Sequence, residues 1–173
     1  MTKRTILIFP IFDNMEIINK IREKYDPLAN LIAPHITLVF PFESELADEE
    51  LFKILEKRLS QFRPFEVEFQ GFSKNISRNG NYLFLNIIKG QNTISEIHDI
   101  LYENEFNEYY SDIPYLPHIT VGKFKNEELL ELAFRDANQY NKLFLCQINK
   151  ISIEMIGSNE ESIIVKERYL DTN

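Results

Sequence analysis

Two histidines stand in the same four-residue context, Pro-His-Ile-Thr, at two places in the chain. The first segment places His35 two residues before Thr37, and the second places His118 two residues before Thr120. Residues i and i+2 of a β-strand project from the same face. Each segment therefore predicts a strand that presents an imidazole and a hydroxyl on one face and apolar side chains on the other.

Side chains of this kind suit proton-transfer chemistry. The unperturbed pKa of histidine is about 6.5, so an imidazole can act as base or as acid near neutral pH. For a single segment, the polar face of a half-exposed strand is the simpler interpretation. The recurrence of the same four residues favours a shared function. The sequence contains no His-Glu-x-x-His motif and no Gly-rich phosphate-binding loop.

The first half of the chain alternates strand and helix patterns. After a short apolar run near the N-terminus, Asp13 can cap a helix of amphipathic pattern. Residues 34–40 alternate as a strand does, and residues 51–62 carry a second helical stripe. Residues 65–70 alternate apolar and polar side chains, which is typical of a half-buried strand. The first half is therefore predicted to be β-α-β-α-β.

The second half repeats this order after Asn79-Gly80, a pair favoured in tight hairpin turns because both central residues tolerate positive φ. The predicted elements that follow are an apolar run to residue 88, a helix over 94–101, a strand over 118–124, a helix capped by Asn126, a single strand over 144–156 and a last strand over 163–169.

Matching elements of the two halves lie about 80 residues apart, an offset longer than the solenoid periods of about 20 to 50 residues. We therefore expect an α+β fold of two pseudo-symmetric lobes. Each lobe would be a mostly antiparallel sheet with helices packed outside, and an active-site cleft would lie between them. Residues 1–173 would form one bilobal domain from an internal duplication, with lobe 1 near residues 1–78 and lobe 2 near 79–173.

Composition narrows the class of protein. A chain of 173 residues with 44% hydrophobic residues can bury one sizeable core. Its net charge of −8 repels long polyanions, so extended nucleic-acid binding is not expected. Cys146 is the single cysteine and is predicted to be a small buried hydrophobe. No segment approaches the roughly 20 apolar residues of a membrane span. We expect a cytoplasmic protein without membrane attachment, with a monomer favoured.

The paired segments resemble the signature of the two-histidine (2H) phosphoesterase superfamily, which is a pair of His-x-Thr/Ser-x motifs with hydrophobic x at about this separation. Here they are His-Ile-Thr-Leu at 35–38 and His-Ile-Thr-Val at 118–121. The resemblance covers nearly the whole chain, since the family fold is also two α+β lobes with one motif each. Pro34 and Pro117 resemble the bacterial branch that includes the 2′-5′ RNA ligase and cyclic phosphodiesterase group.

This resemblance implies a metal-independent phosphoesterase without cofactors. Its substrate would be a 2′,3′-cyclic phosphate or 2′-5′ phosphodiester of a small nucleotide or RNA end, in the hydrolytic or the ligase direction. His35 and His118 would be catalytic, one as base toward water and one as acid toward the departing ribose oxygen. Thr37 and Thr120 would bind the phosphate. We expect His118 to be the base and His35 the acid, an assignment that reverses with substrate orientation.

Three further residues are candidates for lining the substrate. Gly122 follows His118 and Thr120 at strand spacing, so it either leaves room for substrate or allows close packing of two strands. Lys123 either neutralises phosphate or is solvated. Tyr115 is the first choice for stacking on a base.

Other nearby side chains are not assigned to the site. Arg78, beside the expected hairpin turn, either neutralises phosphate or is solvated, as for Lys123. His98 is expected to be an ordinary structural histidine. Core or loop packing is the preferred role for the remaining aromatic residues near the motifs, which are Phe40, Phe42, Tyr109 and Tyr110.

Two alternatives to an enzyme remain open. One is a nucleotide-binding module that retains the cleft with little or no catalysis, although both motifs are intact. The other is a structural or partner-binding duplicate without a ligand. The residues of the connecting loops identify no particular base or substrate.

Overall fold

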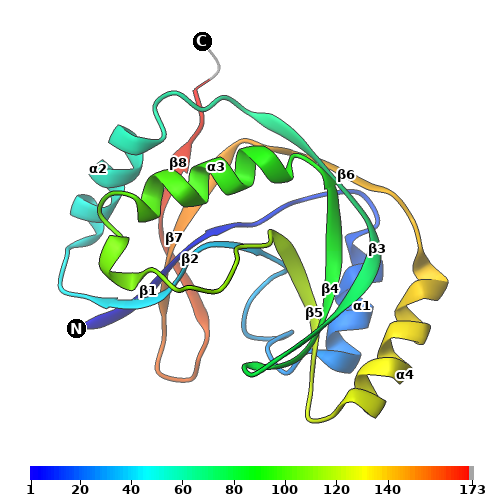
Figure 1. The fold of residues 1–173 in the computed structure, drawn as a ribbon. Coiled ribbons are helices and arrows are strands. Elements are labelled where there is room, and N and C mark those ends of the chain that lie inside the picture. Colours follow the sequence, from blue (N-terminus) through cyan, green and yellow to red (C-terminus); the bar gives the residue numbers. More distant parts are fainter. Residues whose placement is uncertain (172–173) are drawn as a thin grey trace.

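Eight strands form two four-stranded antiparallel sheets in the computed structural model, which describes residues 1–171 (Figure 1). The strand orders are β2-β1-β7-β8 in the first sheet and β5-β4-β3-β6 in the second. Together with four helices, they confirm the predicted α+β class. The strands are β1 Thr2–Ile8, β2 Ile36–Ser44, β3 Phe65–Ser77, β4 Gly80–Lys89, β5 His118–Phe124, β6 Phe144–Ile148, β7 Lys150–Ile156 and β8 Ser162–Tyr169.

The helices cover the two sheets in a reciprocal manner. Helix α1 follows a strand of the first sheet but packs against β5 of the second, and α3 follows a strand of the second sheet but packs against β2 of the first. Helix α2 packs on β7 and β8, and α4 packs on β3, β4 and β5. Within residues 1–171, no helix is long and apolar enough to cross a membrane. The bounds are α1 Met15–Tyr25, α2 Asp48–Arg58, α3 Gln91–Tyr102 and α4 Glu127–Ala137.

Of the two helix caps predicted from the sequence, one is confirmed and one is wrong. Asn126 caps α4 as predicted, because its side-chain oxygen accepts the backbone N–H of Leu129 at 2.9 Å. Asp13 does not cap α1. The residue before that helix is Asn14, which has a left-handed backbone with φ of 63° and makes no side-chain cap hydrogen bond.

The hairpin near Asn79 lies where the sequence predicted it, but its turn is shifted by one residue. Ser77 pairs with Gly80, so Arg78 and Asn79 occupy the turn and Gly80, at φ of 133°, begins β4. Both strands of the hairpin belong to the second sheet. The boundary expected at residues 78 and 79 therefore does not separate the sheets, and each sheet takes strands from both halves of the sequence.

The single strand expected over residues 144–156 is two strands that lie in different sheets. The chain leaves β6 and enters β7 at Asn149. The change is visible in the burial pattern, since Phe144 and Ile148 are buried at even positions while Ile151 and Ile153 are buried at odd ones. Residues 144–156 alternate apolar and polar side chains on both sides of Asn149 and Lys150, which predicts one strand, and the pairing of the strands shows that the chain changes sheet there.

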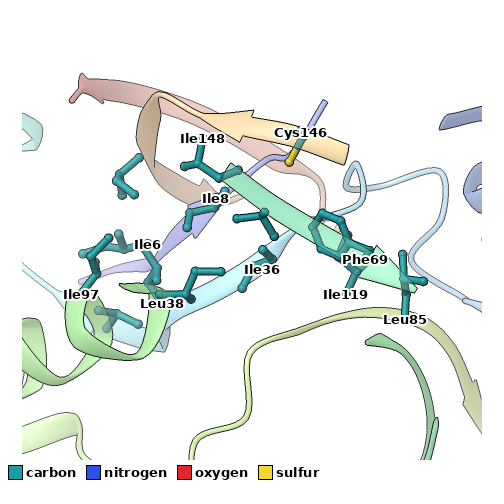
Figure 2. Packing of buried hydrophobic residues seen from close by; sticks show 14 of the residues in the cluster. Ile6, Ile8, Ile36, Leu38, Phe69, Leu85, Ile97, Ile119, Cys146 and Ile148 are labelled. Atoms are coloured by element: carbon teal, nitrogen blue, oxygen red, sulfur yellow. The ribbon is translucent and has the colours of Figure 1, made fainter. Parts of the chain in front are cut away.

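One hydrophobic core connects the two sheets, and Figure 2 shows side chains of both sheets and of α3 packed together. Cys146 is buried in it as predicted, and burial raises the pKa of its thiol to about 12. Core residues that Figure 2 labels are Ile6, Ile8, Ile36 and Leu38 of the first sheet, Phe69, Leu85, Ile119 and Ile148 of the second, and Ile97 of α3.

Replacing Ile119 by Ala tests this core. Ile119 is fully buried between the two motif residues of β5, so its loss leaves a cavity and should cost about 2–5 kcal/mol of unfolding free energy. Ile88→Ala is the matched control, since Ile88 is 47% exposed on the adjacent strand and should cost less than about 1 kcal/mol. Urea unfolding measures both, and equal losses would contradict the packing described here.

Candidate active site

The two Pro-His-Ile-Thr segments enter their strands in the same way. His35 directly precedes β2, and His118 is the first residue of β5. The isoleucine after each histidine is buried in the core, while both histidines and both threonines are partly exposed. The alternation predicted from the sequence therefore places the imidazole and hydroxyl groups on the face opposite the core.

A β-bulge follows the threonine in both strands. Leu38, after Thr37, has no partner in β1, and Val121, after Thr120, has none in β4. A bulge bends the strand and changes which side chains share a face beyond it. The two motifs thus share a backbone irregularity as well as four residues, and the sequence pattern did not reveal it.

The bulge corrects the expectation for Gly122. Pairing with Leu83 turns Gly122 away from the face of His118 and Thr120. A Cβ atom at this position would lie 2.7 Å from the ring of Phe124 and 3.1 Å from the Cβ of Tyr25. Gly122 therefore allows helix α1 to pack closely on β5 and does not make room for a substrate.

Lys123 lies at the edge of the site. It is exposed, pairs with Tyr82 across the strands, and its Nζ atom stands 5.7 Å from the centre of the Tyr82 ring. Tyr82 lines a pocket beside His118, whereas Lys123 does not. Lys123 therefore contacts a residue of the pocket wall but is not itself part of that wall.

Each imidazole is held by a backbone carbonyl two residues earlier in the chain. His35 Nδ1 lies 2.9 Å from the Ala33 oxygen, and His118 Nδ1 lies 2.6 Å from the Leu116 oxygen. A carbonyl can only accept, so Nδ1 carries the hydrogen in both rings. In a neutral ring, Nε2 is then the acceptor that remains for other partners.

Burial lowers the pKa of both imidazoles. For His118 the value falls to about 4, and the hydrogen bond to the Leu116 carbonyl only partly opposes this effect. The charge of His35 also lowers the His118 pKa. For His35, burial is again the largest cause. Both rings are therefore neutral at neutral pH in the free protein.

Phe84 stacks on His118, with ring centres 3.5 Å apart and an angle of 21° between the planes. Phe84 pairs with Thr120 across the strands. No pattern in the sequence predicts this contact, because Phe84 lies in a continuous apolar run. Phe9 is farther from the other histidine, at 6.1 Å from His35.

Two adjoining pockets bring the motif residues together. The larger, of about 380 Å³, is lined by His118, Thr120 and Thr37, and the smaller, of about 210 Å³, is lined by His35 and Thr37. Because Thr37 belongs to both, we refer to the two pockets together as the cleft. Arg78 and Phe40, which the sequence analysis left out of the site, also line the larger pocket.

Tyr115 lines the larger pocket, but its hydroxyl is already engaged. It donates a hydrogen bond to the Thr37 carbonyl at 2.7 Å, and its ring lies parallel to that of His98, with centres 3.6 Å apart. His98 is buried and donates from Nδ1 to the carbonyl of the bulged Leu38 at 2.7 Å, which confirms its structural role. The hydroxyl of Tyr102 accepts the N–H of Phe40 at 3.0 Å. These three side chains bind the edge of β2 that has no neighbouring strand within residues 1–171.

The remaining aromatic candidates divide between core and surface. Phe42 is buried against Phe106 and Tyr109, and the Tyr109 hydroxyl donates to the Glu43 carbonyl at 3.2 Å. Tyr110 is 60% exposed and lies outside the cleft. The predicted packing role therefore holds for Phe42 and Tyr109, whereas Tyr110 lies at the surface.

The loop before His35 is fixed by an arginine that the sequence analysis missed. Arg22 is almost fully buried, pairs with Asp26 at 2.9 Å and donates to the carbonyl of Ile32 at 2.8 Å. These bonds hold the segment that supplies the Ala33 carbonyl to His35. The described part of the chain contains no group of three or more His, Cys, Asp or Glu side chains placed to hold a metal ion.

Comparison with protein families gives one match that covers most of the chain. The family model described as the 2′-5′ RNA ligase superfamily matches residues 12–156. A Geobacillus kaustophilus protein with the provisional name phosphoesterase is 31% identical over 125 residues, which cover 70% of this chain and 69% of the relative. A Halalkalibacterium halodurans protein with the same provisional name is 32% identical over 124 residues, covering 68% of each chain.

Solved structures with the same fold are distant in sequence. A Thermus thermophilus protein has a TM-score of 0.63 at 14% identity and covers 97% of both chains. Escherichia coli LigT in complex with 3′-AMP has a TM-score of 0.57 at 16% identity, covering 98% of this chain and 99% of LigT. LigT has also been solved with ATP and with NADP+. These likenesses establish the shared two-sheet fold.

The lowered pKa of His118 predicts an acid-sensitive stability. In the unfolded chain this histidine binds its proton near pH 6.5, but in the folded protein only near pH 4. Between these values the unfolded state binds more protons, so stability should fall as pH decreases from about 6.5 toward 4.

The variant His118→Asn should lose less stability than the wild type over that interval, because an asparagine has no proton to take up. Urea unfolding at several pH values measures the difference. His35 and His98 remain in both proteins and contribute equally, so identical pH slopes for the two proteins would show that His118 is not held in its neutral form.

Proposed function

The chain belongs to the 2′-5′ RNA ligase superfamily, and from that premise we propose that it is a metal-independent phosphoesterase. Its substrate in this proposal is a 2′,3′-cyclic phosphate or a 2′-5′ phosphodiester of a small nucleotide or an RNA end. The chemistry is acid–base catalysis by His35 and His118, with Thr37 and Thr120 binding the phosphate.

One observation carries this proposal. Both imidazoles are oriented by the same Nδ1 contact to a backbone carbonyl, which leaves both Nε2 atoms available in pockets that the two threonines also line. General acid–base catalysis at phosphorus needs two proton-transfer groups on opposite sides of the reacting atom. Thr37 lines both pockets, so a phosphoryl group placed at Thr37 would have one histidine on each side.

In this proposal His118 is the base and His35 is the acid. The pKa of His118 is lowered to about 4, so this ring stays neutral and its Nε2 can take a proton from the attacking water. The water oxygen then bonds to phosphorus, and the bond to the departing ribose oxygen breaks. His35 gives that oxygen a proton from Nε2. Binding of the anionic phosphate favours protonation of His35, because a nearby negative charge raises the pKa of an imidazole.

The threonines act on the phosphoryl oxygens. A hydroxyl that donates a hydrogen bond to a non-bridging oxygen stabilises the negative charge that collects there in the transition state. Thr37 and Thr120 are positioned by rigid strands, and the bulges after them fix the direction of the strands. Lys123, at the rim, adds positive charge near the same group in this proposal.

A nucleotide substrate is favoured by two considerations. The larger pocket is lined by Phe40, Tyr82 and Phe84, and an aromatic ring can stack on a base of any sequence. LigT, which shares the fold, has been solved with 3′-AMP, ATP and NADP+, all of which contain an adenosine moiety. The net charge of −8 is compatible with a small or terminal substrate rather than a long nucleic acid.

Replacing either histidine tests the function. His35→Ala or His118→Ala should lower kcat/KM for nucleoside 2′,3′-cyclic phosphates by about 10² to 10⁴-fold, the usual contribution of a positioned acid or base. Wild-type turnover should survive treatment with a chelator. Turnover that disappeared on chelation would contradict the metal-independent mechanism, and mononucleotide binding without any turnover would favour a binding module.

The variant Tyr115→Phe tests whether Tyr115 positions Thr37 or binds substrate. It removes the hydrogen bond to the Thr37 carbonyl but keeps the ring that stacks on His98. We expect kcat to fall about fivefold to tenfold with KM nearly unchanged, because the hydroxyl group of Thr37 is displaced from the phosphate. Tyr140→Phe, outside the cleft, is the control. A raised KM with normal kcat would instead assign the hydroxyl of Tyr115 to substrate binding.

A further inference from the structure

The two pockets of the cleft differ in charge. Among the described residues, the larger pocket is lined by one arginine, Arg78, and by no carboxylate, although the chain contains 27 acidic residues against 19 lysines and arginines. The smaller pocket is lined by two carboxylates, Glu154 and Glu160, and by Lys3. The cleft therefore has a basic pocket on one side of Thr37 and a predominantly acidic pocket on the other, and we call this difference in charge the polarity of the cleft.

Arg78 is free to bind an anion. It occupies the turn of the β3–β4 hairpin, and in the described residues no carboxylate lies within ion-pair distance of its guanidinium. Asn75 and Asn79 line the same part of the larger pocket and can donate hydrogen bonds. A guanidinium with neighbouring amides suits a phosphate, whose oxygens accept several hydrogen bonds at once.

Glu154 gives the smaller pocket the opposite character. It lies on β7 beside Thr5 of β1, is only 2% exposed, and burial raises the pKa of its carboxyl group. The titratable groups that share its pocket are Lys3, His35 and Glu160. A hydroxyl can bond to this carboxyl in either protonation state. A phosphate would meet a like charge or force the carboxyl to remain protonated, and both cost binding free energy.

We propose that this polarity orients the substrate, with any second phosphate bound by Arg78 in the larger pocket and an uncharged, hydroxyl-bearing alcohol beside Glu154 in the smaller one. The inference rests on the proposed phosphoesterase function and deepens it. Since the smaller pocket contains His35, the alcohol that lies there is the one whose oxygen leaves. The substrate class is then a phosphodiester whose retained nucleoside carries a further phosphate and whose leaving alcohol carries none.

Equilibrium binding tests the Arg78 half of the proposal without requiring turnover. Isothermal calorimetry should show that the wild type binds adenosine 2′,5′-bisphosphate about fivefold to tenfold more tightly than 2′-AMP, as one added charge-assisted contact provides. Arg78→Gln should abolish this preference. Arg63→Gln, which removes an exposed arginine outside the cleft, should retain it. Equal affinities in the wild type, or an undiminished preference in Arg78→Gln, would overturn the proposal.

Cleavage of two matched substrates tests the Glu154 half. Both are 2′-5′-linked diadenosines, one with an extra phosphate on the 5′-hydroxyl of the retained nucleoside and one with it on the 3′-hydroxyl of the leaving nucleoside. The wild type should prefer the first by at least about tenfold in kcat/KM, a difference of about 1.4 kcal/mol in transition-state binding. Glu154→Gln should narrow the ratio several-fold, and so should Glu160→Gln, an exposed substitution that keeps the fold.

Glu56→Gln, an exposed change of the same charge on α2, is the control and should leave the ratio unchanged. Equal cleavage of the two substrates, or a ratio that neither cleft variant alters, would overturn the proposed orientation. A failure of the underlying function looks different. In that case the wild type binds neither nucleotide and cleaves neither dinucleotide, and the inference falls with it.

Discussion

The hydrogen bonds that hold the free edge of β2 are the constraint on which the cleft depends. Within residues 1–171 this strand pairs only with β1, and it carries Thr37 two residues after His35. Tyr115 and His98 bind the carbonyl groups of two successive residues there, and the bulge at Leu38 makes both carbonyls available on one side. An unpaired strand edge would otherwise be solvated or mobile. Residues of the second half of the chain thus determine the geometry of the first motif.

The same burial that orders the imidazoles also sets their protonation. Each ring donates Nδ1–H to a carbonyl of its own loop, so no second side chain is needed to fix the tautomer. Desolvation then lowers the pKa values, and His118 is affected strongly enough to stay neutral well below neutral pH. A general base must be neutral before it reacts, whereas a general acid must be protonated, which binding of an anionic phosphate favours. Burial acts in the same direction on both rings, as expected for two nearly equivalent histidines.

The reciprocal packing of helices explains why the two sheets behave as one unit. Helix α1 covers β5 and α3 covers β2, so each sheet is completed by a helix that follows a strand of the other sheet. Close contact of α1 with β5 requires Gly122, where a side chain would collide with Tyr25 and Phe124. The hydrophobic core, part of which is drawn in Figure 2, contains residues of both sheets. The cleft lies between parts that cannot separate without exposing that core.

The sequence by itself determined the α+β class, the order of the helices and strands, and the two His-x-Thr segments on strands with a buried and an open face. These features depend on local periodicity and on short motifs, which a single chain displays directly. The sheet change at Asn149, the bulges after both threonines, and the role of Gly122 were decided by the tertiary structure. So were the contacts of Phe84 with His118 and of Tyr115 with the Thr37 carbonyl, together with the charge difference between the pockets. Strand pairing and packing between distant parts of the chain bring these groups together. Neither of them produces a periodic pattern in the sequence, so neither could be predicted from it.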